Sequence, residues 1–144
     1  MWRWQLLKEV GLRVGPSGKV IGLDISADQI AAAKSFCEEV AHIEFFNGKL
    51  EKLEGSDHQL DSVTSTQTLE YVEDLDSLMK SMVKLMKPRS KFVNYSTLWD
   101  YFRFHGPEEE LNQLIHTAAI HQVHLMLPSK LLGILNKYGF HNVR

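Results

Sequence analysis

The apolar residues of this chain change repeatedly from the spacing of a helix to that of a strand, and Gly and Pro mark the joints. In "GKVIGLDISADQIAAAK", residues 18–34, a strand ends on Asp24 and a helix begins directly after it. Strands that alternate with helices predict parallel pairing through right-handed crossovers, hence an α/β fold. The pattern predicts helices at 3–13, from Ser26 to about 40, from about 74 to Pro88, at 107–124 and at 128–138, and strands at 20–24, 42–46, 60–65 and 91–96.

Several residues support these boundaries. Ser26 suits the N-cap of the second helix, and Asp74 or Asp76 lies near the start of the third. Pro88 is expected to end that third helix, and Gly139 to cap the last one. Cys37 falls on the apolar face of the second helix, so we expect a small buried hydrophobe rather than a nucleophile. The stripe of Leu and Met residues between 75 and 86 is interpreted as core packing rather than as a binding groove.

Size and charge restrict the class of protein. A chain of 144 residues with 44% hydrophobic and 24% charged residues suits one domain over 1–144. The net charge of −2 gives no basic stripe for nucleic acid. The lone Cys37 cannot form an internal disulfide, and no apolar run is long enough to span a bilayer. We therefore expect a soluble, cytoplasmic protein that does not bind nucleic acid and has no membrane span.

Asp24 is the residue that most suggests a ligand. Open parallel sheets bind ligands at the carboxyl ends of their strands, where Asp24 lies. A carboxylate there can accept hydrogen bonds from the two hydroxyl groups of a ribose, which predicts a nucleoside-containing ligand. An aspartate that only caps the following helix is the alternative.

Four segments carry a resemblance to a known family: "VGPSGKVIGLDISADQIAAAK", "VEDLDSLMKSMVKLMKP", "KFVNYSTLWDYFRFHG" and "LPSKLLGILNKYGF". Together they resemble the S-adenosylmethionine-dependent methyltransferases of the ubiquinone and menaquinone biosynthesis type (methyltransferase type 11). The resemblance implies a Rossmann-like class I methyltransferase fold of three layers with a mostly parallel sheet. It also implies S-adenosylmethionine as cofactor and a small-molecule substrate.

The resemblance assigns roles residue by residue. Asp24 matches the acid that holds the ribose of S-adenosylmethionine, and Ile25 the apolar residue on its adenine. Gly48, Lys49 and Leu50 match three consecutive positions of the family, the middle one of which is an acid that binds the adenine amine. Lys49 departs from this pattern, because an ammonium cannot accept a hydrogen bond. Thr66, followed by Gln67, matches the passage near the methionine end of the cofactor and the substrate, so Thr66 completes the set of cofactor-binding candidates.

Two further departures concern glycines. "KPRS" at 87–90 replaces the family's Lys-Pro-Gly-Gly, and a side chain forced into the positive φ that these glycines allow costs roughly 1 kcal/mol, unless the turn has another shape. The family's glycine-rich turn before the ribose-binding acid has no counterpart, and the family's last two strands would follow residue 144. We therefore expect a domain truncated at both ends. Strands 20–24 and 60–65 would then pair directly, or a neighbouring molecule would pair with both, and a homo-oligomer stays open.

Catalytic residues are unknown from the sequence. His105, His121 and His124 are candidates for the substrate side, and we expect no metal site, although His121 and His124 could share a helix face. The sequence leaves two roles open for Trp99, Tyr101 and Phe104: they either line the binding site of an apolar substrate or belong to the core. Two interpretations remain: a methyltransferase acting on a small, partly apolar acceptor, and an inactive homologue that acts as a binding or partner protein. An unrelated nucleotide-binding fold is a third.

Overall fold

A computed structural model of the chain describes residues 2–55, 59–101, 103, 105–119 and 121–143. Its contacts divide the chain into two compact units, Met1–Asp57 and His58–Arg144, and each is described by itself. The single domain expected over 1–144 stays a prediction. No helix in the described ranges combines the length and apolar character needed to cross a membrane.

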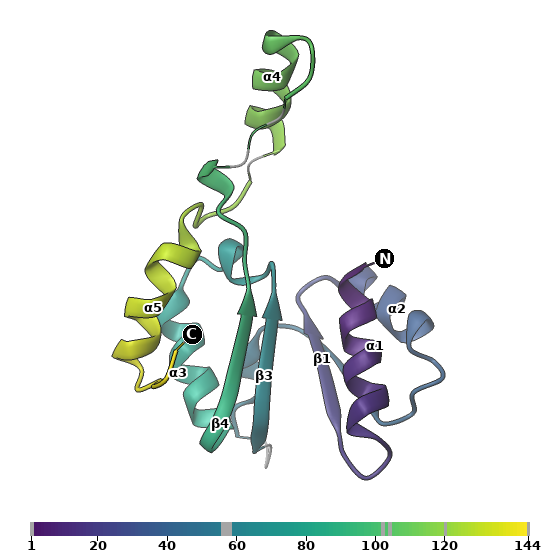
Figure 1. Ribbon diagram of the computed structural model, residues 1–144. Helices are drawn as coiled ribbons and strands as arrows, with labels where there is room; N and C mark the ends of the chain where they lie inside the picture. Colours follow the sequence, from purple (N-terminus) through teal and green to yellow (C-terminus); the bar gives the residue numbers. More distant parts are fainter. Residues whose placement is uncertain (1, 56–58, 102, 104, 120, 144) are drawn as a thin grey trace. The chain divides into compact units, whose positions relative to one another are not determined.

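The first unit is a pair of parallel strands packed against two helices (Figure 1). Strand β1 (Val20–Asp24) pairs with β2 (Ile43–Asn47), and the register sets Asp24 opposite Asn47. Helices α1 (Trp2–Val14) and α2 (Ala27–Phe36) contact β1 and each other. Their core is formed by buried Val20, Cys37, Val40 and Ile43.

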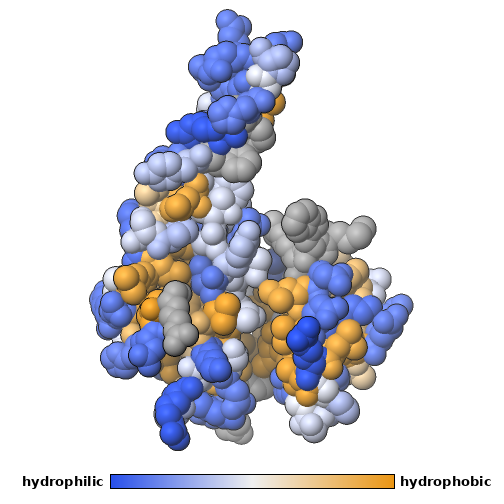
Figure 2. Space-filling view, viewed as in Figure 1, coloured by the Kyte–Doolittle hydropathy of each residue, from blue (hydrophilic) through white to orange (hydrophobic). Residues whose placement is uncertain are grey.

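The second unit holds another parallel pair, whose arrowheads point the same way in Figure 1. Strand β3 (Leu60–Thr66) pairs with β4 (Met86–Tyr95). Helix α3 (Leu75–Leu85) contacts β4, and an ion pair from Lys137 to Asp76 ties α5 (Leu127–Lys137) to α3. Helix α4 (Glu109–Ala119) lies between β4 and α5 in the sequence. Hydrophobic residues gather over the part of this unit that carries α5 and β4 (Figure 2).

Most expected elements are present, and their caps are those that the sequence indicated. The Ser26 side chain accepts a hydrogen bond from Gln29 N at the start of α2, and Asp74 accepts one from Ser77 N at the start of α3. Tyr138 is the C-cap of α5, and Gly139, with φ +82°, is the next residue. In the methionine-rich stripe of α3, Met79 and Met82 are buried, so its role is core packing as expected.

Some boundaries differ from the prediction. Helix α3 ends at Leu85, before Pro88, because Met86 already adopts an extended conformation and pairs with Leu60. Pro88 therefore lies within β4 rather than ending the helix. Helix α4 is shorter than the predicted 107–124. The strand pairs found within the two units of the described chain are β1 with β2 and β3 with β4, and the direct pairing of the strands at 20–24 and 60–65 stays a prediction.

The segment "KPRS" forms an irregular start to β4. Leu60 pairs with Met86 and Ser62 pairs with Lys91, so the register shifts between these two pairs. Over this stretch β4 has more residues than β3, and the additional residues lie within 87–90. Arg89 has φ +66°, in the left-handed region. A non-glycine residue thus occupies the first of the family's two glycine positions with the backbone angle that glycine would favour, which confirms the expected strain.

Candidate functional site

Asp24 is the last residue of β1, and its carboxylate is held in place by the chain that follows. Its Oδ1 accepts a hydrogen bond of 2.8 Å from the backbone N–H of Ser26. The side chain is half-buried, and no further hydrogen bond to it is found in the described part of the chain. A carboxylate has about four acceptor positions. Asp24 therefore keeps capacity for a ligand that donates hydrogen bonds while one contact fixes its orientation.

Ile25 continues directly from Asp24 and is 75% exposed. Its backbone is anchored nonetheless, because Asn47 Nδ2 donates to Ile25 O at 2.9 Å and to Asp24 O at 3.1 Å. The backbone N–H of Gly48 adds a hydrogen bond of 2.9 Å to Asp24 O. The ends of β1 and β2 are thus locked together, and they present an apolar side chain beside an oriented carboxylate.

Gly48 begins the third segment of this site, with φ +153°. A Cβ added there would lie 2.7 Å from Lys52 Cδ, so a larger residue would displace the Lys52 side chain. Lys49 is exposed and precedes the 3₁₀ helix Leu50–Leu53, in which Leu50 is half-buried. Five of the six expected binding residues therefore lie at the carboxyl ends of β1 and β2: Asp24, Ile25, Gly48, Lys49 and Leu50.

Thr66, the sixth, lies in the second unit as the last residue of β3 and is half-buried. Gln67 follows with φ +45°, another non-glycine residue in the left-handed region. Its backbone N–H donates to Tyr95 O at 2.8 Å, and its Nε2 donates to Thr97 Oγ1 at 3.1 Å. Backbone strain of this kind is common at functional positions. The carboxyl ends of β3 and β4 therefore form a polar, well-connected edge.

Glu70 is the residue of this edge that sequence analysis missed. It is fully buried, and its Oε1 accepts a hydrogen bond of 3.1 Å from Thr97 N. Oε2 has no partner among the described residues. Its backbone carbonyl accepts a hydrogen bond from His124 N at 2.9 Å. Glu70 thus connects the turn after β3 to the segments that follow β4 and precede α5. The only sequence signal was a glutamate between apolar Leu69 and Tyr71.

The histidine and aromatic candidates are dispersed. His121 and His124 lie between α4 and α5 rather than on a helix, so the prediction that they could share a helix face was wrong. His124 Nε2 lies 2.8 Å from Val72 O, which gives that ring a structural contact. His105 and Tyr101 are exposed, Trp99 is half-buried, and Phe104 lies outside the described residues. Across the described ranges, no group of three or more His, Cys, Asp or Glu side chains is placed to hold a metal ion.

Cys37 has the properties of a core residue. It is 2% exposed, and burial raises the pKa of its thiol, although nearby Lys8 acts in the opposite direction. Because thiolate is the nucleophilic form, a raised pKa makes the residue unreactive. This confirms the interpretation of Cys37 as a small buried hydrophobe.

Comparison with known proteins decides the family. The sequence profile of the methyltransferase domain family matches residues 5–94. The chain belongs to this family. It is 36% identical over 86 residues to the demethylmenaquinone methyltransferase of Lactococcus lactis, an alignment covering 58% of this chain and 34% of the relative. The corresponding protein of Bacillus cytotoxicus is 33% identical over 86 residues, covering 58% and 36%. The chain thus spans about a third of the length of these relatives.

Solved structures support the fold. The YcgJ protein of Bacillus subtilis superposes with a TM-score of 0.61 at 17% identity, covering 83% of this chain and 51% of that one. A protein described as a putative methyltransferase from Bacillus halodurans gives 0.60 at 18% identity, covering 85% and 53%. The chain has a Rossmann-like α/β fold with parallel strands, and membership of the family implies S-adenosylmethionine as the cofactor.

Proposed function

We propose that the chain binds S-adenosylmethionine at the carboxyl ends of β1 and β2 and transfers its methyl group to a small, partly apolar acceptor. The observation that supports this most is the Asp24 carboxylate, oriented by Ser26 N–H next to exposed Ile25. Asp24 would accept hydrogen bonds from the ribose hydroxyls, and Ile25 would cover one face of the adenine. The hydrogen bond from Ser26 N orients the Asp24 carboxylate within the chain itself, which lowers the entropy lost on binding.

The chemistry asked of the protein is modest. The sulfonium of S-adenosylmethionine supplies an already activated methyl group. The protein has to hold the cofactor and the acceptor in line and exclude water. Asp24, Ile25 and the backbone at Gly48 would hold the nucleoside. Thr66 and Gln67, at the end of β3, would contribute to the side on which the acceptor binds.

Lys49 is the residue that fits least well. An ammonium donates hydrogen bonds and cannot accept one from the adenine amine. Lys49 is exposed, so its long side chain can turn into solvent rather than oppose the ligand. We expect the Lys49→Asp variant to bind S-adenosylmethionine roughly five- to tenfold more tightly, because an acceptor for the amine is worth about 1 kcal/mol.

Isothermal titration of the full chain with S-adenosylmethionine tests the proposal. Saturable binding is expected for the wild type. Asp24→Ala should abolish it, and Asp24→Asn should weaken it while keeping an oxygen that can accept from Ser26 N. Asp28→Ala is the matched control, because Asp28 is an exposed acid in the first turn of α2 and should leave affinity unchanged. Circular dichroism of each variant verifies folding.

The absence of binding at millimolar S-adenosylmethionine in the wild type would reject the proposal and favour the inactive homologue. Tight binding of a nicotinamide dinucleotide instead would favour the third interpretation. If the wild type binds S-adenosylmethionine, transfer of a radiolabelled methyl group should be measured next. Demethylmenaquinone is the first acceptor to test, since two of the relatives are named for it. A cytoplasmic location, supported by the free Cys37 thiol, belongs to the same proposal.

A further inference from the structure

Asn47 connects the ends of β1 and β2 through its side chain. The strand register places it opposite Asp24, and its Nδ2 donates to two successive carbonyl groups, Asp24 O at 3.1 Å and Ile25 O at 2.9 Å. A side-chain amide has two N–H donors, and only this side of it can face two carbonyl oxygens. The two peptide groups that flank Ile25 are therefore both held by one side chain of the neighbouring strand.

The second of these peptide groups also orients the Asp24 carboxylate. Its carbonyl belongs to Ile25 and its N–H to Ser26, and that N–H donates to Asp24 Oδ1 at 2.8 Å. Because a peptide group is planar, the direction of its carbonyl fixes the direction of its N–H. A hydrogen bond accepted by the carbonyl also polarises the N–H and strengthens the bond that it donates. We call this series, from the Asn47 amide through the Ile25–Ser26 peptide to the Asp24 carboxylate, the Asn47 relay.

The first peptide group has a second support. Asp24 O accepts a hydrogen bond from the backbone N–H of Gly48 at 2.9 Å as well as from Asn47 Nδ2. Loss of the Asn47 side chain therefore leaves the two strands joined at Asp24 O. Ile25 O, in contrast, then loses the one hydrogen bond found for it among the described residues. A substitution of Asn47 should thus interrupt the relay while the strand pair persists.

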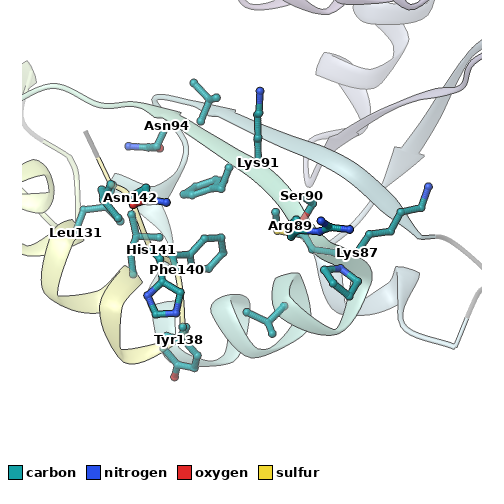
Figure 3. Close-up of a pocket in the computed structure, with 18 residues that line it drawn as sticks. Lys87, Arg89, Ser90, Lys91, Asn94, Leu131, Tyr138, Phe140, His141 and Asn142 are labelled. Atoms are coloured by element: carbon teal, nitrogen blue, oxygen red, sulfur yellow. The ribbon is translucent and has the colours of Figure 1, made fainter.

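An asparagine near the end of a strand does not make this connection by default. Asn94 lies near the carboxyl end of β4 (Figure 3), and its Nδ2 donates to Ser96 Oγ at 2.7 Å, two residues further along the same segment. Asn47 reaches instead across the strand pair, to residues more than twenty positions earlier in the sequence. Its contact serves the end of the strand that carries Asp24.

We propose that Asn47 is a positioning residue for the Asp24 carboxylate and thereby for the ribose of S-adenosylmethionine. This rests on the proposed function, in which Asp24 accepts hydrogen bonds from the ribose hydroxyls. An oriented carboxylate loses less freedom on binding, so the relay raises affinity without a contact from Asn47 to the ligand. The amide is essential to this role, because aspartate has the same shape but its carboxylate would turn only acceptors toward two carbonyl oxygens.

Amide hydrogen exchange of the full chain without ligand tests the relay directly. The Ser26 N–H should exchange roughly three- to tenfold faster in Asn47→Ala and Asn47→Asp than in the wild type, because its hydrogen bond to Asp24 weakens. The Ile30 N–H, which donates to Ser26 O at 3.1 Å, should keep its protection and shows that α2 is intact. Glu44→Ala is the matched control. Glu44 is an exposed residue of β2 whose ion pair with Lys19 lies before the carboxyl ends of the strands, so Ser26 exchange should not change.

The affinities for S-adenosylhomocysteine and for its 2′-deoxy analogue show whether Asn47 acts through the ribose. The wild type should bind the form with the hydroxyl roughly tenfold or more tightly, since the deoxy form lacks a hydrogen bond to a carboxylate. In Asn47→Asp this ratio should fall to about two- to threefold, because a misoriented carboxylate gains little from the hydroxyl. Glu44→Ala should keep the wild-type ratio.

Unchanged Ser26 exchange in both Asn47 variants would overturn the proposal, whether or not the chain binds a nucleoside. Equal weakening of both ligands would also overturn it, since Asn47 would then support the fold without acting on the ribose. Absence of binding of either ligand by the wild type would reject the proposed function and the role at the ribose. The exchange of Ser26 N–H would still decide whether Asn47 orients Asp24.

Discussion

Replacing Arg89 by glycine should stabilise the protein. Arg89 has φ +66°, and no hydrogen bond or ion pair of its side chain is found in the described part of the chain. A residue with a Cβ in the left-handed conformation costs roughly 1–2 kcal/mol. Glycine removes this cost but gives the unfolded chain about 0.4–1 kcal/mol of extra conformational freedom. The net gain in the free energy of unfolding is therefore about 0.5–1 kcal/mol.

Lys91→Gly is the matched control, because Lys91 is also an exposed cation of β4 but does not have a positive φ. It removes the same charge and should cost roughly 0.5–1 kcal/mol, as glycine does in a strand. Urea unfolding would be followed by the fluorescence of Trp99, with Trp2 and Trp4 replaced by phenylalanine so that only the second unit reports. We expect the Arg89→Gly midpoint to rise by roughly 0.3–0.5 M.

The two variants should move in opposite directions. Equal shifts for Arg89→Gly and Lys91→Gly would show that the loss of charge, and not the backbone angle, controls the stability of this segment. A destabilised Arg89→Gly would refute the argument from φ, since it would mean that the arginine side chain contributes more than its backbone costs.

Three further outcomes are expected. Cys37 should react slowly with a disulfide reagent in the native protein and rapidly in urea, because burial raises the pKa of its thiol; equal rates would contradict its burial. Lys137 lowers the pKa of Asp76, so this ion pair stabilises the protein above a pH of about 4 and is lost as the pH falls further; Asp76→Asn should flatten that acid dependence in thermal melts. Glu70→Ala should cost about 2–3 kcal/mol, since it leaves a cavity and an unpaired Thr97 N, whereas Glu70→Gln keeps the acceptor and should cost less than about 1 kcal/mol in urea unfolding.

Local signals in the sequence were enough to predict the helices and strands whose ends are set by neighbouring residues. Helix α3 is an example, because Asp74 caps it and its buried Met79 and Met82 repeat at helical spacing. Its C-terminal end was not predictable in this way. There the pairing of Met86 with Leu60, 26 residues away in the sequence, takes the chain into β4 before Pro88 is reached. Tertiary pairing thus overrode the local stop signal.

The difference between local signals and tertiary contacts also explains why the burial of Glu70 was not predicted. A glutamate between two apolar residues is compatible with an exposed loop position. Its burial depends on a hydrogen bond to Thr97 N, 27 residues further along, and on the approach of His124. Neither contact has a signature in the local pattern. The polar edge at the ends of β3 and β4 therefore emerges only when the strands are paired.

Asp24 shows how pattern and structure combine at the proposed site. The sequence placed an acid at a strand end, and its alternative role was to cap the next helix. In the structure Ser26 caps that helix, and Asp24 instead accepts from Ser26 N, so the carboxylate is oriented rather than used as the cap. Ile25 beside it is 75% exposed, on a backbone that Asn47 anchors through two hydrogen bonds. An apolar side chain exposed to solvent gains no stability in the free protein, whereas covering it with a planar base gains hydrophobic energy. We therefore propose that the oriented carboxylate of Asp24 and the exposed side chain of Ile25 serve ligand binding, and the Asp24→Ala titration tests this.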